Sequence, residues 1–111
     1  MFSIIGSLLG AYLVFVVALF ALQRSMIYHP GSAPPSPERM GVAEMKIVSA
    51  KTEDGLELAG WFVPPKSEKP LIVLFHGNAG SVADRAFKAR RYMDRGYGML
   101  LAEYRGFGGN P

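Results

Sequence analysis

The chain has 111 residues, a net charge of +3 and no cysteine. Without cysteine there are no disulfides and no thiol or thiolate–metal chemistry. The two histidines, His29 and His76, lie far apart without the spacing of metal ligands, so we expect no metal site. A charge this small does not call for a nucleic-acid partner, and we expect none.

Residues 1–23 carry no charged side chain, and 13 of them are Leu, Ile, Val or Phe. About 20 apolar residues span a bilayer. We therefore expect a transmembrane helix over residues 1–23 that contacts the lipid bilayer and makes this a single-pass membrane protein. A cleaved signal peptide and a soluble core helix are the alternatives. The signal peptide is disfavoured because no Lys or Arg precedes the apolar run.

Two further features concern the membrane. Arg24, Arg39 and Lys46 follow the apolar run, and the positive-inside rule then favours the cytoplasm for the remainder of the chain. Gly6 and Gly10 form a small-xxx-small pair, which is consistent with self-association of the helix.

Residues 24–43 are interpreted as a juxtamembrane segment and a linker, because Gly31–Pro37 holds three prolines. Alternating segments at 44–51 and 56–63 then flank Asp54-Gly55, a dipeptide typical of hairpin turns. These segments predict an antiparallel β-hairpin.

The next segments predict a strand, a helix and a second strand. Leu71–Phe75 is apolar at every position, as in a central strand buried on both faces. Ser81 is a candidate helix cap. The second strand is expected at residues 99–102, parallel to the first. One stripe of the helix should face the core: Val82, Ala86, Ala89 and Met93. Its basic residues should form a solvated outer face: Arg85, Lys88, Arg90, Arg91 and Arg95.

The turn between the first strand and the helix reads His76-Gly77-Asn78-Ala79-Gly80. A strand that breaks into a glycine-rich turn before a helix exposes backbone N–H groups. Such groups can bind a developing negative charge, as in an oxyanion hole.

Together with Tyr104-Arg-Gly-Phe-Gly after the second strand, this order resembles the start of an α/β-hydrolase. More narrowly, it resembles the membrane-anchored serine hydrolases of the S33 peptidase-like branch. The resemblance implies an α/β fold, the N-terminal part of a mixed sheet with a β-hairpin and then a βαβ crossover, preceded by one transmembrane helix. The hydrolase domain would span residues 44–111.

The resemblance also implies roles for the motif residues. The N–H of Asn78 would be one of two oxyanion donors. Gly77 and Gly80 would allow the sharp turn, and His76 would orient the loop rather than act as a base. The remaining pocket or loop residues would be Ala79, Tyr104, Arg105 and Gly106.

The sequence contains no Gly-x-Ser-x-Gly, the only serine after Asn78 is Ser81, and no histidine follows. We therefore expect the N-terminal portion of a longer serine hydrolase, inactive alone and without a cofactor. The parent enzyme would act on ester, thioester or amide bonds of an acyl small molecule or a peptide through an acyl-enzyme. A Ser81–His76 dyad is disfavoured because Ser81 is better explained as a cap.

Two other classes stay open. One is a non-catalytic single-pass membrane protein whose α/β remnant binds a partner. The other is a nucleotide-binding module using the glycines at 106–109, although the third glycine of that motif is missing. In this short chain, Leu71–Phe75 would be left as an unpaired apolar edge, and residues 31–111 alone should be insoluble or molten.

Overall fold

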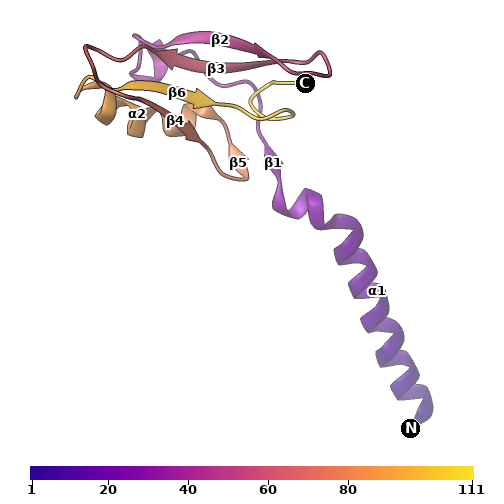
Figure 1. Ribbon diagram of the computed structural model, residues 1–111. Helices are drawn as coiled ribbons and strands as arrows, with labels where there is room; N and C mark the ends of the chain where they lie inside the picture. Colours follow the sequence, from indigo (N-terminus) through magenta and orange to yellow (C-terminus); the bar gives the residue numbers. More distant parts are fainter.

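A computed structural model describes residues 1–111 as one long helix and one small α/β domain (Figure 1). Helix α1 runs from Phe2 to Ile27, four residues beyond the expected end, and none of its residues is buried. At 1.5 Å per residue it is about 39 Å long. The helix is long and apolar enough to cross a membrane. It is not a core helix of this chain, because it projects away from the domain.

The domain is built on a four-stranded sheet with the order β2-β3-β6-β4. Strands β2 (Lys46–Lys51) and β3 (Glu57–Val63) form the predicted antiparallel hairpin. Gly55 turns between them with φ +89°, a conformation that glycine adopts readily. Strands β4 (Leu71–Phe75) and β6 (Gly98–Ala102) are parallel neighbours, which confirms the predicted crossover.

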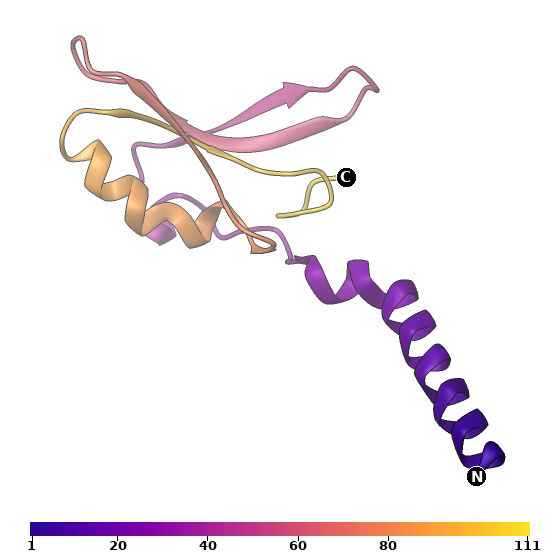
Figure 2. The ribbon, with the colours of Figure 1, turned by 60° about the horizontal axis from the view of Figure 1, so that its bottom comes forward.

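One face of this sheet is covered by the crossover helix (Figure 2). The helix begins as a 3₁₀ turn, η2 (Val82–Arg85), and continues as α2 (Ala86–Met93). The predicted apolar stripe is confirmed, because all four of its members are buried. They belong to one core with residues of β3 and β6: Trp61, Met99 and Leu101.

Strand β4 differs from the prediction. The expectation that Leu71–Phe75 is buried on both faces is wrong, since Val73 is 47% and Phe75 57% exposed. Only the alternate residues Ile72 and Leu74 pack against the core. β4 lies at the edge of the sheet, as expected for the chain alone, and nothing covers its second face. The buried central strand is β6.

The segment after α1 packs against the domain. Strand β1 (His29–Pro30) pairs in parallel with β5 (Ala79–Gly80), so the chain leaves α1 directly beside the glycine-rich loop (Figure 1). After the 3₁₀ turn η1 (Glu38–Met40), Val42 is fully buried. The juxtamembrane segment therefore forms part of the domain's packing.

The first residues of the expected hydrolase domain are held by an arginine from the crossover helix. Arg90 of α2 donates to both carboxylate oxygens of Glu44 and to the carbonyl of Gly41. These hydrogen bonds from Arg90 lower the pKa of Glu44 to about 2. Arg90 is thus an exception to the expected solvated face, and its contacts hold the end of the linker on α2.

Candidate functional site

The site begins with the loop 76–80, which connects β4 to η2. The Ser81 hydroxyl accepts a hydrogen bond from Ala83 N (3.3 Å), and the Asp84 carboxylate accepts one from Ser81 N (2.7 Å). This reciprocal capping box confirms the predicted role of Ser81. Gly80 has φ +88°, and a Cβ there would collide with the Asp84 carboxylate. The local sequence therefore fixes where the loop ends.

Within the loop, the backbone of Asn78 has one bonded and one unbonded polar group. Its carbonyl accepts a hydrogen bond from His29 N at 2.8 Å. Its N–H donates no hydrogen bond within the chain. The strand β1 therefore holds the loop through the Asn78 carbonyl and leaves the N–H available to a ligand.

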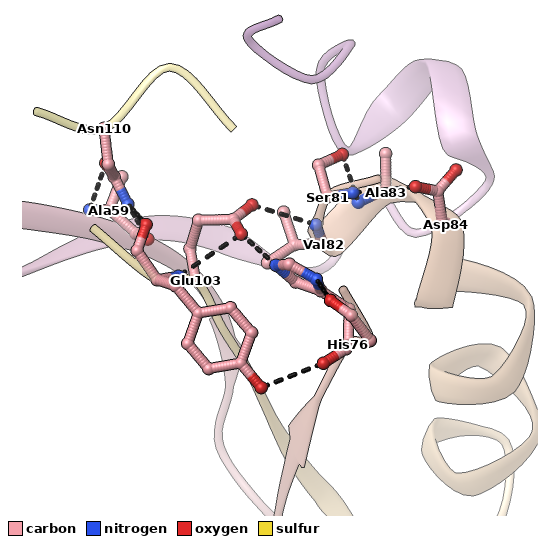
Figure 3. Close-up of polar contacts among 10 residues, drawn as sticks. Ala59, His76, Ser81, Val82, Ala83, Asp84, Glu103 and Asn110 are labelled. Carbon is pink, nitrogen blue, oxygen red and sulfur yellow. Dashed lines mark hydrogen bonds and ion pairs between the residues drawn. The ribbon is translucent and has the colours of Figure 1, made fainter. Parts of the chain in front are cut away.

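His76 lies under this loop and is 5% exposed. Its Nδ1 is hydrogen-bonded to the carbonyl of Gly77 at 2.8 Å, and its Nε2 is hydrogen-bonded to Glu103 Oε1 (Figure 3). Both ring nitrogens therefore have a hydrogen-bond partner within the chain. The ring is therefore engaged in holding the loop and has no free nitrogen to serve as a base or to pair with Ser81.

Glu103, directly after β6, is the residue that the sequence interpretation missed. It is buried beside His76, and it also accepts hydrogen bonds from Val82 N (3.0 Å) and Tyr104 N (3.3 Å) (Figure 3). One carboxylate thus joins the loop, the start of the helix and the end of β6. The sequence feature that could have identified Glu103 is its position, as an acidic residue directly after the apolar residues 99–102.

Tyr104 is brought to the loop as expected. Its hydroxyl donates to the carbonyl of His76 at 2.9 Å, and its ring packs against the rings of Phe75, His76 and Phe107. Asn110 accepts from Ala59 N at 3.0 Å and thereby fixes the loop that follows Tyr104 to β3 (Figure 3).

Arg105 has a different position from that expected of a pocket residue. Its guanidinium donates to the Asp54 carboxylate at 2.9 Å, at the turn of the β2–β3 hairpin. The arginine's hydrogen bonds lower the pKa of Asp54 to about 2 and raise the pKa of Arg105. Arg105 therefore tethers the loop to the hairpin turn.

A cavity of about 220 Å³ lies beside the loop. Three of the expected residues line it, namely Gly77, Asn78 and Tyr104, together with Tyr28 and Phe107. The other expected residues lie outside its lining: His76, Ala79, Gly80, Arg105 and Gly106. The Arg85 guanidinium approaches the loop as well, since Nη2 is 3.9 Å from the position that a Cβ would take at Gly77.

The residues that line the cavity include no serine, histidine or carboxylate. One of them is Asn78, whose backbone N–H forms no hydrogen bond within the chain. The structure contains no group of three or more residues that could hold a metal ion.

Comparison with known proteins bears on the fold of the chain. No family model matches the chain. It is 36% identical over 99 residues to the uncharacterized protein Rv2307c of Mycobacterium tuberculosis, covering 86% of the chain and 35% of the relative. It is 28% identical over 108 residues to the alpha/beta hydrolase domain-containing protein WAV2 of Arabidopsis thaliana, covering 89% of the chain and 35% of the relative.

A solved esterase, Pf2001 of Pyrococcus furiosus, superposes with a TM-score of 0.55 at 25% identity. The match covers 76% of this chain and 33% of the esterase. The chain therefore spans about a third of the length of the relatives it matches. The strand order, the crossover and these similarities agree, and the chain has the fold of the N-terminal part of an α/β-hydrolase.

Proposed function

We propose that this chain is the N-terminal portion of a membrane-tethered serine hydrolase that cleaves ester, thioester or amide bonds. The observation that carries the proposal is that Asn78, in a loop between a strand and a helix, lines a cavity and has a backbone N–H that forms no hydrogen bond within the chain. The apolar α1 supports the tether.

In this mechanism a serine beyond the present chain attacks the acyl carbonyl carbon. A histidine takes the serine proton and delivers it to the leaving group, and water then hydrolyses the acyl-enzyme. The Asn78 N–H would bind the oxyanion of each tetrahedral intermediate together with the N–H after the nucleophile. Loss of one such donor typically costs about 3–4 kcal/mol.

In this chain, residues that never touch the substrate would position the donor. His76 and Glu103 hold the loop from below, and the His29 N–H holds the Asn78 carbonyl. Hydrogen bonds made before substrate arrives need no rearrangement during reaction, which is what makes such a hole effective.

The proposal is tested both on the gene and on the full gene product. The nucleotide sequence should be read past codon 111 in all frames, and the full gene product should be treated with a fluorophosphonate that labels activated serines. We expect a downstream Gly-x-Ser-x-Gly, covalent labelling of its serine and hydrolysis of a p-nitrophenyl acyl ester. A gene without that motif, or a product that neither labels nor hydrolyses esters, would overturn the proposal.

A further inference from the structure

One wall of the cavity comes from the end of the apolar helix α1. Tyr28 immediately follows α1, yet it lines the same cavity as Gly77, Asn78 and Phe107. The next residue, His29, donates its N–H to the carbonyl of Asn78. The candidate oxyanion donor is therefore held at the end of the apolar helix rather than on a distant domain.

The depth of this cavity can be compared with the thickness of a bilayer. Tyr28 is six residues beyond Leu22, the last apolar residue before Gln23 and Arg24, or about 9 Å along a helix axis. The headgroup layer on each side of the hydrocarbon core is roughly 5–8 Å thick. If α1 spans the bilayer, the cavity lies at the outer edge of the headgroup layer. This depth is nearer to the lipid phosphates than to the ester carbonyls, which lie next to the hydrocarbon core, so a lipid would have to move a few ångström outward to bring its ester to the cavity.

The third observation is a cation beside the loop. Arg85 lies against Gly77, is partly buried, and forms no ion pair or hydrogen bond within the chain. Arg90 and Arg105 both have carboxylate partners. A guanidinium without a partner next to the candidate oxyanion donor matches an anionic group such as a phosphate.

We propose that the acyl substrate is a bilayer lipid with an anionic phosphate headgroup, entering this cavity from the membrane surface. Its ester carbonyl would contact the Asn78 N–H and its phosphate would contact Arg85. This inference rests on the proposed hydrolase function and assigns its substrate class. The aromatic rings of Tyr28, Tyr104 and Phe107 would contact the apolar part of the lipid next to the ester.

The experiment detects binding of the lipid and does not depend on its hydrolysis. The full gene product is reconstituted in nanodiscs that contain phosphatidylglycerol with a diazirine near one ester carbonyl, irradiated, and mapped by mass spectrometry. We expect label on peptides containing Gly77–Asn78 and Tyr104–Phe107, several-fold above that obtained with the same photolabel on diacylglycerol, which has the same esters but no phosphate. A water-soluble short-chain ester with the same diazirine should label these peptides far less.

Arg85→Gln should remove the preference for phosphatidylglycerol, while labelling by diacylglycerol should stay unchanged. Lys88→Gln is the matched control, because Lys88 is an exposed cation one turn further along the helix. Label confined to α1, equal labelling by the two lipids, or equal effects of the two variants would overturn the inference.

Failure of this inference differs from failure of the proposed function. A protein that hydrolyses soluble esters but shows no lipid label in the loop would contradict the substrate class alone. A protein that binds the lipid at the loop but hydrolyses no ester would contradict the hydrolase function.

Discussion

The buried pair of His76 and Glu103 connects the loop to the sheet at the scale of single residues. Glu103 is bonded to the His76 ring and to two backbone N–H groups. Loss of one partner from a buried hydrogen-bonded pair leaves the other polar group unsatisfied, which costs about 1–3 kcal/mol for each such group. The pair therefore makes the position of the loop depend on one carboxylate.

Glu103→Ala should lower the free energy of unfolding by about 2–6 kcal/mol, because the His76 ring and the Val82 N–H each lose a buried hydrogen-bond partner. Chemical denaturation of the full gene product measures this change. Glu57→Ala, at an exposed position of β3, is the control and should change stability little. Similar losses in both variants would contradict the structural role of Glu103.

The Asp54–Arg105 pair predicts a pH dependence. The pKa of Asp54 is lowered from 3.8 to about 2, so this carboxylate is charged at lower pH in the folded protein than in the unfolded chain. The pair's contribution is therefore fully present above about pH 4 and is lost as pH falls through about 2. Both side chains are exposed, so the energy involved is small.

The Arg105 Nε signal in NMR spectra should report this titration. We expect its shift to change between about pH 4 and pH 2, and Asp54→Asn should abolish that change. A signal that titrates identically in the variant would show that Arg105 does not contact Asp54.

Sequence motifs located the loop residues but not their partners. His76 and Asn78 were identified because a glycine-rich turn follows an apolar strand. Glu103 was missed because its partner is 27 residues away in sequence, and only the parallel pairing of β4 with β6 brings the two together. Arg105 was expected at the pocket for its place in the motif, whereas the nearby Asp54 attracts its guanidinium.

At the scale of the elements, β1 connects the apolar helix α1 to the candidate site. Its two residues pair with β5, and one bond reaches the Asn78 carbonyl. Such a short pairing has no periodicity, so the sequence could not reveal it. The hairpin and the βαβ crossover were predictable because alternation, turn residues and an apolar helical stripe each extend over several residues.

His29→Pro removes the N–H that bonds to Asn78 O, whereas His29→Ala retains it. One hydrogen bond contributes about 0.5–1.5 kcal/mol. We therefore expect amide hydrogen exchange in residues 77–80 to become up to roughly tenfold faster in the proline variant only. Equal exchange in the two variants would mean that β1 does not hold the loop.

At the scale of the whole molecule, the sheet is covered on one face only. Leu71, Val73 and Phe75 of β4 are exposed on the other face and at the sheet edge. The sequence predicted burial on both faces because all five residues of this strand are apolar. Such a run does not show whether other elements cover both faces of the strand. An exposed apolar edge strand is prone to pair with other chains.

Residues 31–111 expressed alone should therefore aggregate or remain molten. Val73→Lys should raise the soluble fraction, because a charge on the exposed face opposes edge pairing. Ile72→Lys, on the core-facing side, should not. Sedimentation and thermal denaturation measure both, and a soluble wild-type monomer with a sharp transition would contradict this prediction.

The central claim is that the Asn78 N–H stabilises an oxyanion, and the most direct measurement compares kcat of Asn78→Pro with that of Asn78→Ala in the full gene product. Proline removes the N–H, whereas alanine retains it. We expect kcat for a p-nitrophenyl ester to fall about 10²–10³-fold in the proline variant, with KM little changed, and to stay near wild type in the alanine variant. Unfolding midpoints of both variants report whether the loop remains folded. A folded proline variant with wild-type kcat would contradict the claim.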